Sequence, residues 1–233
     1  MFTGLVKSLG QVRFLDAYHL EIHCLEKYLD QPRSSFLGQL EYGDSVAVDG
    51  ICLTVEQIHS QGFIATTSPE TLRRTTLGLP DSPAWVNLEP SLRVGDKLGG
   101  HFVTGHIDGI GYLNALEETA QSWQLAFHLP PASPVARYLV PKGSIAVNGV
   151  SLTIASCDTA GTQFTVAVIP VTFAETNLKY LKPNSPVNLE GDILGKYVEK
   201  LIHFQSVSGK IQENTIDRAF LQEHGYETLP ELY

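Results

Sequence analysis

Two stretches of the sequence carry a thiol or a hydroxyl in the same local frame. Residues 45–55 read SVAVDGICLTV and residues 144–154 read SIAVNGVSLTI, so Cys52 and Ser151 occupy equivalent places. Either group can act as a nucleophile or relay a proton when a base lies nearby. The stretches therefore predict two related reactive sites. The structural alternative for Cys52 is a small buried hydrophobic residue.

Each stretch continues with a threonine, Thr54 in the first and Thr153 in the second. Because side chains alternate along a strand, both threonines are expected on the face opposite Leu53 and Leu152. There they could form hydrogen bonds with a bound molecule. An ordinary role as β-branched strand residues is the alternative.

The two stretches belong to a longer internal repeat. TGLVKSLG from residue 3 matches TGHIDGIG from residue 104, Phe63 matches Phe164, and VNLE from residue 86 recurs from residue 187. These pairs are 101 residues apart, whereas the stretches with Cys52 and Ser151 are 99 apart, so small length differences fall in the loops between matched blocks. A period near a hundred residues indicates a duplicated domain. We expect each copy to be a complete unit.

Histidine and aspartate residues occur where the other copy lacks them. His101 and His106 stand in GGHFVTGHIDG, and the first copy has Leu5 in the place that matches His106. Asp192 follows VNLEG, where the first copy has Ser91. Since an imidazole exchanges protons near neutral pH, this asymmetry favours a functional role. A turn histidine and an aspartate that caps the next helix are the structural alternatives.

The matched blocks are typical of short strands. Alternating residues run up to Asp-Gly or Asn-Gly, the pairs that form tight hairpin turns, and the blocks 63–71 and 164–172 are each interrupted by a proline. Several short strands in about ninety residues predict a small antiparallel barrel or sandwich. Short helices are expected after Pro69 and Pro170 and within residues 133–141. In the tail, one helix is expected over residues 195–204 and another over residues 215–225.

Composition excludes several classes of protein. The chain has 233 residues and a net charge of −9, and its basic residues are few and scattered, which argues against a nucleic-acid partner. No stretch approaches the roughly 20 apolar residues of a membrane-spanning helix, and the N-terminus has no secretory pattern. Three cysteines fit a reducing compartment, and eight histidines show no metal-ligand spacing. We expect a cytoplasmic protein without a metal site or a membrane partner.

Five strings, MFTGLV, VDGICLTV, GGHFVTGHIDG, VNGVSLTI and VNLEGDILGKYVE, together resemble riboflavin synthase of the α-chain type over about residues 1–204. The resemblance implies an all-β fold of two tandem, similar six-stranded Greek-key antiparallel barrels with a C-terminal helix. It implies barrels over residues 1–98 and 99–194 and a helical tail over residues 195–233 that forms a homotrimer. Lumazine synthase is a further partner that it suggests.

The resemblance also implies a reaction. Each barrel would bind one molecule of 6,7-dimethyl-8-ribityllumazine, and a four-carbon unit would pass from one molecule to the other. The products would be riboflavin and 5-amino-6-(ribitylamino)uracil, with no metal or organic cofactor. The active site would form between the N-terminal barrel of one subunit and the C-terminal barrel of the next.

Residues of both copies acquire expected roles from this resemblance. The candidates for catalysis are Ser151, Thr153, His106, Cys52, Asp192 and Ser45. The expected substrate-binding residues are Gly4, Leu5, Val6, Cys52, Leu53, Thr54, Thr66, Thr67, Ser68, Pro69, Glu70, Thr71, Gly105, His106, Ile107, Lys142, Ser151, Leu152, Thr153, Ala167, Val168, Ile169, Pro170, Val171 and Thr172. The identity of the base or nucleophile stays open, as does the choice of donor and acceptor barrel.

Two other functions share this architecture. A lumazine- or flavin-binding antenna protein would keep the barrels and lose pocket motifs in one of them, whereas both motifs are present here. A flavin-dependent reductase would need a nucleotide-binding partner domain, and no GxGxxG motif follows a strand. The residues therefore favour the enzyme.

Overall fold

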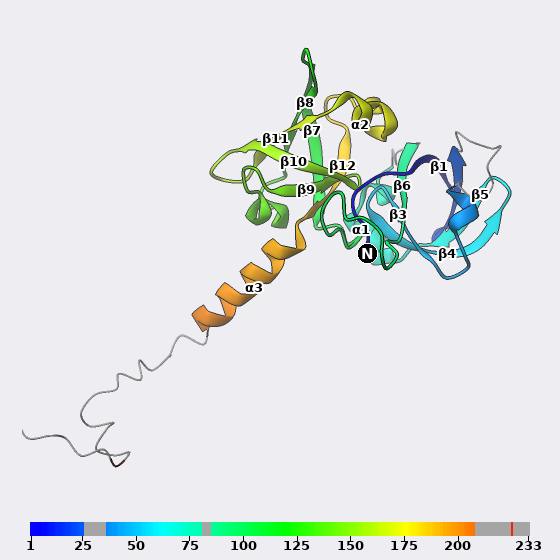
Figure 1. Ribbon diagram of the computed structural model, residues 1–233, viewed down its shortest axis with the longest axis horizontal. Coiled ribbons are helices and arrows are strands. Elements are labelled where there is room, and N and C mark those ends of the chain that lie inside the picture. The colour runs from blue at the N-terminus through cyan, green and yellow to red at the C-terminus, as the bar shows by residue number, and fades with distance from the viewer. Residues whose placement is uncertain (26–35, 81–84, 208–224, 226–233) are drawn as a thin grey trace, which may run out of the picture. The chain divides into compact units, whose positions relative to one another are not determined.

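The computed structural model describes residues 1–25, 36–80, 85–207 and 225. Its main feature is a pair of closed barrels, each made of six antiparallel strands (Figure 1). The strands of the first barrel are β1 (Ser8–Phe14), β2 (His19–Leu25), β3 (Ser45–Val48), β4 (Ile51–His59), β5 (Gly62–Thr66) and β6 (Trp85–Pro90). The strands of the second are β7 (Gly109–Glu118), β8 (Trp123–His128), β9 (Ser144–Val147), β10 (Val150–Cys157), β11 (Gln163–Val168) and β12 (Pro186–Gly191).

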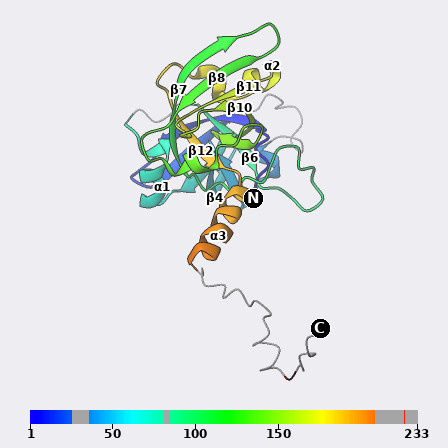
Figure 2. The same cartoon turned by 90° about the vertical axis from the view of Figure 1, so that its left-hand side faces the viewer.

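The two barrels have the same topology. Around the first barrel the order is β1-β2-β5-β4-β3-β6, and the second follows the same order with each strand number raised by six. Even the bulge is shared, because the register shifts between Val55 and Gln57 on β4 and between Ile154 and Ser156 on β10. The predicted fold of two Greek-key barrels is confirmed. One difference is the long hairpin of β7 and β8, which stands out in Figure 2.

The predicted hairpin turns join the barrels to each other. Asp49 and Gly50 have φ values of 48° and 79°, and Asn148 and Gly149 have 47° and 74°, the left-handed values of a type I′ turn. The two turns pack back to back, and a Cβ atom on Gly50 would lie 2.8 Å from the backbone nitrogen of Gly149. Glycine is therefore required by conformation and by space.

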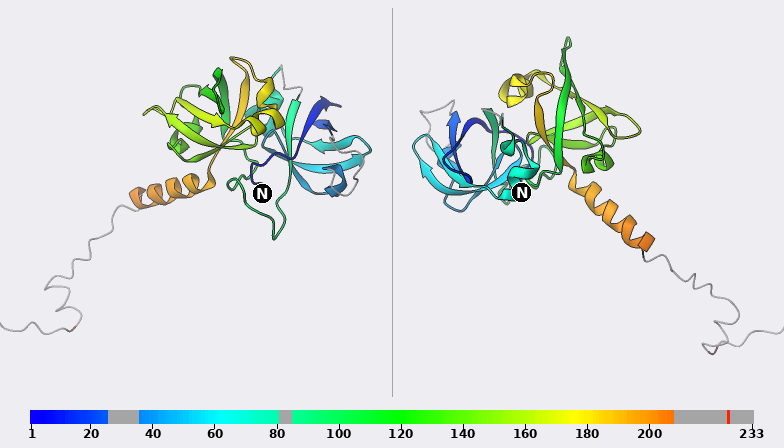
Figure 3. Two further views of the ribbon diagram at one scale, coloured as in Figure 1. Left: turned by 45° about the horizontal axis from the view of Figure 1, so that its top comes forward. Right: turned by 180° about the vertical axis from the view of Figure 1, so that it is seen from behind.

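Hydrophobic residues form one core in each barrel and a small third cluster between them. The third cluster consists of Phe2, Ala47, Val103 and Ala146, two residues from each copy. Phe2 and Val103 form an antiparallel bridge, with N–H···O distances of 2.8 and 3.1 Å. The N-terminus accordingly lies at the junction of the barrels in both views of Figure 3.

A buried polar network crosses the same junction. The side-chain amide of Asn87 donates to the carbonyl oxygen of Asn148, and that of Asn188 donates to the carbonyl oxygen of Asp49. Asn177 donates from Nδ2 to the Asp49 carboxylate at 2.9 and 3.2 Å. Burial raises the pKa of Asp49 well above its ordinary value, and the hydrogen bonds from Asn87 and Asn177 oppose that rise. These mutual bonds fix one arrangement of the two barrels.

Helices are short except at the end of the second barrel. The two predicted proline-led helices are confirmed as α1 (Pro69–Arg74) and α2 (Pro170–Glu175). The helix expected within residues 133–141 is the 3₁₀ helix η3 (Pro134–Tyr138). Three further 3₁₀ turns are η1 (Leu37–Gln39), η2 (Thr76–Gly78) and η4 (Asn177–Tyr180).

The helix expected over residues 195–204 is present as α3 (Ile193–Val207). The second predicted tail helix, over residues 215–225, lies outside the described residues except for Gly225. Within the described ranges, no helix is both long and apolar enough to cross a membrane.

Candidate functional site

The first barrel carries a row of hydroxyl groups on three neighbouring strands. Ser45 of β3 pairs with Thr54 of β4, which pairs in turn with Thr66 of β5. Within the described part of the chain, the buried hydroxyls of Thr66 and Thr67 have no hydrogen-bond partner. Because a buried hydroxyl without a partner costs free energy, a ligand whose polar atoms reached these groups would recover part of that cost.

The second barrel offers fewer hydroxyls at the matched positions. Ser144 pairs with the exposed Thr153, but Ala167 and Val168 stand where the first copy has Thr66 and Thr67. The two expected binding surfaces are therefore alike in backbone and different in polarity.

Cys52 and Ser151 lie at the junction of the barrels and not at their outer ends. Both are half-buried, and each pairs with an alanine of the third cluster, Ala47 or Ala146. This location brings them close to residues of the opposite copy, which the sequence repeat did not predict.

Ser151 is hydrogen bonded to a histidine. Its Oγ lies 2.7 Å from Nδ1 of His101, and either atom can donate, depending on the imidazole tautomer. Only 8% of His101 is exposed, and its Nε2 is buried without a partner among the described residues. Burial lowers the pKa of His101, and the nearby Asp192 carboxylate raises it. A serine, a histidine and a carboxylate are thus gathered at one place, suited to moving a proton.

His101 lies against this serine, whereas the catalytic candidate His106 lies elsewhere on the same segment. His106 is exposed on the segment before β7. Both histidines showed the same asymmetry between copies, so the repeat alone could not rank them. The backbone before His101 also lies close to this serine, because a Cβ atom on Gly100 would lie 2.9 Å from Ser151 Oγ.

Asp192 has the capping role that the sequence offered as the structural alternative, and it also lies near His101. Its Oδ1 accepts a hydrogen bond of 3.0 Å from the backbone N–H of Leu194, so it caps the start of α3. It also acts electrostatically on His101. The cap holds the carboxylate in place at the start of α3.

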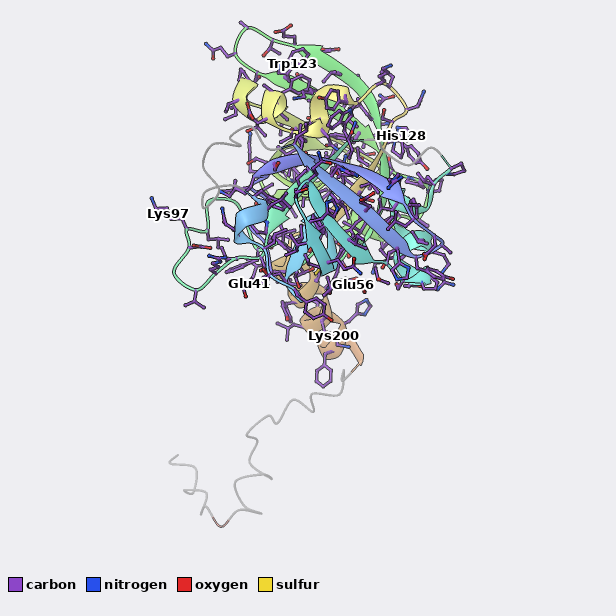
Figure 4. The ribbon with its side chains drawn as sticks, turned by 90° about the vertical axis from the view of Figure 1, so that its right-hand side faces the viewer. Glu41, Glu56, Lys97, Trp123, His128 and Lys200 are labelled. Carbon is purple, nitrogen blue, oxygen red and sulfur yellow. The ribbon has the colours of Figure 1, made fainter. Side chains whose placement is uncertain are left out.

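Several expected substrate-binding residues can contribute only through their backbone. Leu53, Leu152 and Val168 are buried in the barrel cores. In contrast, Ile169 and Val171 are more than half exposed at the start of α2. Phe173 of α2 stacks on Trp123, with ring centroids 4.1 Å apart, and Figure 4 shows Trp123 beside this helix.

The polar residues around α1 form hydrogen bonds and ion pairs within the helix and its N-cap. Ser68 Oγ accepts a hydrogen bond of 3.0 Å from the N–H of Thr71, and Glu70 forms ion pairs with Arg73 and Arg74. These local bonds fix the end of β5, next to the unpaired hydroxyls.

Lys142 holds a backbone conformation that favours glycine. Its φ is 68°, and the matched residue of the first copy is Gly43, with a φ of 89°. The N–H groups of both donate to the matched strand, to Ile154 and Val55 respectively. A lysine in this conformation costs stability, and its exposed side chain is compatible with the expected binding role.

We expect Lys142→Gly to raise the free energy of unfolding by about 1 kcal/mol, because the left-handed conformation no longer carries a Cβ atom. The same change should raise the KM for the substrate about tenfold, the loss expected for one charge-assisted hydrogen bond. Chemical denaturation and steady-state kinetics measure the two effects. Gly43→Lys is the matched control and should only destabilise. A stabilised Lys142→Gly protein with an unchanged KM would exclude the binding role.

Comparison with known proteins gives consistent matches. The profile of the lumazine binding domain matches the chain twice, over residues 3–91 and 104–192. Riboflavin synthase of Bacillus subtilis (strain 168) is 36% identical over 232 residues, covering 97% of this chain and 100% of that protein. Riboflavin synthase of Actinobacillus pleuropneumoniae is 35% identical over 229 residues, with the same coverage. The crystal structure of LumP complexed with riboflavin has a similar fold, with a TM-score of 0.68 and 23% identity over 82% of this chain and 99% of that one.

Proposed function

The chain belongs to the riboflavin synthase family, and from this premise we propose how its two barrels perform the family's reaction. It is a transferase that converts two molecules of 6,7-dimethyl-8-ribityllumazine into riboflavin and 5-amino-6-(ribitylamino)uracil. Atoms and electrons balance between two substrates and two products, so the reaction needs no external oxidant or reductant. The enzyme must hold two like molecules together and move protons between them.

The observation that carries this function is the pair of barrels with one topology in one chain. A reaction between two identical molecules needs two similar sites, and duplication supplies them. Holding both reactants in the correct geometry can contribute about 7–11 kcal/mol toward the barrier in the best-oriented cases. We assign residues 1–98 and 99–194 to the two lumazine-binding units.

The side chains divide the remaining work. In the second barrel Ser151, bonded to His101 and backed by Asp192, transfers a proton or adds to the ring, and Thr153 and Lys142 bind the substrate. In the first barrel Cys52 takes the place of Ser151, and the hydroxyls of Ser45, Thr54 and Thr66 meet the polar atoms of the second molecule. The side chain of His106 is exposed, so it can contact a substrate molecule bound at the surface of this chain.

We further propose a homotrimer formed through the apolar side of α3, with each active site shared between the barrels of neighbouring subunits. Leu194, Tyr197, Leu201 and Phe204 lie on one side of this helix and are about two thirds exposed. Such a face is stabilised when it is covered by another apolar surface. The expected location is the cytoplasm, and lumazine synthase, which would supply the substrate, is the expected partner.

Purified protein incubated with 6,7-dimethyl-8-ribityllumazine should produce riboflavin absorbance, with two substrate molecules consumed for each riboflavin formed. The Ser151→Ala protein measures the background. Tight binding of the lumazine without flavin formation would instead identify an antenna protein of the same fold.

A further inference from the structure

The segments that lead into the two barrels each contact both barrels. We define the first leading segment as residues 2–6 and the second as residues 103–107. Val6 of the first packs against the hydrophobic core of the second barrel, and Ile107 of the second packs against the core of the first. Each leading segment therefore contributes an apolar side chain to the core of the opposite barrel.

A buried glutamate holds each leading segment in its own barrel. Glu89 of β6 accepts hydrogen bonds from the N–H and hydroxyl of Thr3 at 2.7 and 2.6 Å, and from the N–H of Gly4 at 2.9 Å. Glu190 of β12 binds Thr104 at 2.7 and 2.6 Å and Gly105 at 3.0 Å in the same pattern. At most 5% of either glutamate is exposed, so these are hydrogen bonds of buried groups and not of surface side chains.

The far side of each leading segment contacts a candidate reactive residue of the opposite barrel. The carbonyl oxygen of Gly4 accepts a hydrogen bond of 2.8 Å from the N–H of Ser151, and that of Gly105 accepts one of 2.9 Å from the N–H of Cys52. The two backbones are in close contact. A Cβ atom on Gly4 would lie 2.5 Å from the Cβ of Ser151, and one on Gly105 would lie 2.5 Å from the Cβ of Cys52. A shift of the segment must therefore move the reactive side chain.

We propose that Glu89 and Glu190 are positioning residues that act across the barrel junction. Glu89, through Thr3 and Gly4, fixes Ser151 of the second barrel. Glu190, through Thr104 and Gly105, fixes Cys52 of the first. The proposal rests on the proposed function only in naming these two residues as reactive, and the positioning itself is a property of the free protein.

The carboxylate is specifically required at these positions. Each glutamate accepts hydrogen bonds from two N–H groups and a hydroxyl of its leading segment, and both of its oxygens accept. A glutamine would turn one acceptor into an NH₂ group that faces a backbone N–H. Two donors that face each other repel, so the segment would have to move. Glu190→Gln and Glu89→Gln should therefore release their leading segments without creating a cavity.

The alkylation rate of individual thiols tests the crossed pattern without any substrate. In Glu190→Gln the rate at Cys52 should change about tenfold, the size expected for losing one hydrogen bond to a charged group. In Glu89→Gln it should stay within twofold. In a Ser151→Cys background the introduced thiol should show the opposite dependence, responding to Glu89→Gln and not to Glu190→Gln. Peptide mapping by mass spectrometry separates these sites from Cys24 and Cys157.

Milder variants cover the case in which a glutamine variant does not fold. Thr104→Val and Thr3→Val each remove one hydroxyl bond to the glutamate and keep the carboxylate, and they should give the same crossed pattern at a smaller size. Equal responses of both thiols to both variants, or no response of Cys52 to Glu190→Gln and Thr104→Val, would overturn the proposal. If the variants show the crossed pattern but the unchanged protein makes no riboflavin, the proposed function is refuted and the positioning proposal is not.

Discussion

Ser151→Ala is expected to lower the turnover number by a factor of about 10² to 10⁴, the usual contribution of a positioned acid or base. The reason is geometric, because the Ser151 hydroxyl lies 2.7 Å from a buried imidazole whose protonation is tuned by burial and by Asp192. His101→Ala should cause a loss of similar size. If the pair acts as one unit, the double variant is no slower than the slower single variant.

Stability and pH dependence separate this role from a structural one. Burial lowers the pKa of His101, so protonation should reduce kcat/KM only at pH values below the ordinary histidine range, and this acidic limb should vanish in His101→Ala. Ser156→Ala is the matched control, since Ser156 lies on the same strand and bonds across the surface to Thr165. Additive losses, or Ser151→Ala unfolding at a much lower denaturant concentration, would argue that the pair only supports the junction.

The duplication made most of the fold predictable. The turns at Asp49-Gly50 and Asn148-Gly149 have a local cause, since few other pairs adopt left-handed φ twice in succession. The helices at Pro69 and Pro170 have one too, because proline fits the first helical position. Signals of this kind depend on neighbouring residues, so a single sequence contains them.

The contents of the junction were not predictable in the same way. Each copy closes its own six-stranded barrel, but Val6 and Ile107 pack against the opposite core, and Asn87 and Asn188 bond to backbone groups of the opposite copy. A repeat shows which residues correspond, but two identical frames give the same pattern whether a segment packs in its own barrel or in the other. The hydrogen bond between His101 and Ser151 was not predictable for this reason, since it depends on which residues lie together at the junction.

The largest effect on assembly is expected from Leu201→Asp on α3. Leu201 is 64% exposed, and it lies between Tyr197 and Phe204 on the apolar side of the helix. Burying a leucine in an interface is worth about 1.5–3 kcal/mol, and replacing it by a carboxylate adds a desolvation cost, repeated in every subunit of a symmetric assembly. The trimer should dissociate, as sedimentation velocity would show, and activity at low protein concentration should fall more than tenfold.

The dependence of activity on protein concentration connects the loss of the trimer with the loss of activity. If each active site combines barrels of neighbouring subunits, the Leu201→Asp protein should regain activity as its concentration rises and trimers reform, because mass action favours association. Lys200→Glu changes an exposed charge on the preceding residue and should leave both the trimer and the activity intact. Removing the chain after Lys196 takes away most of the helix and should abolish assembly at every concentration. A truncated protein that sediments as before, or monomers with full activity, would show that one chain's two barrels suffice and that α3 has another purpose.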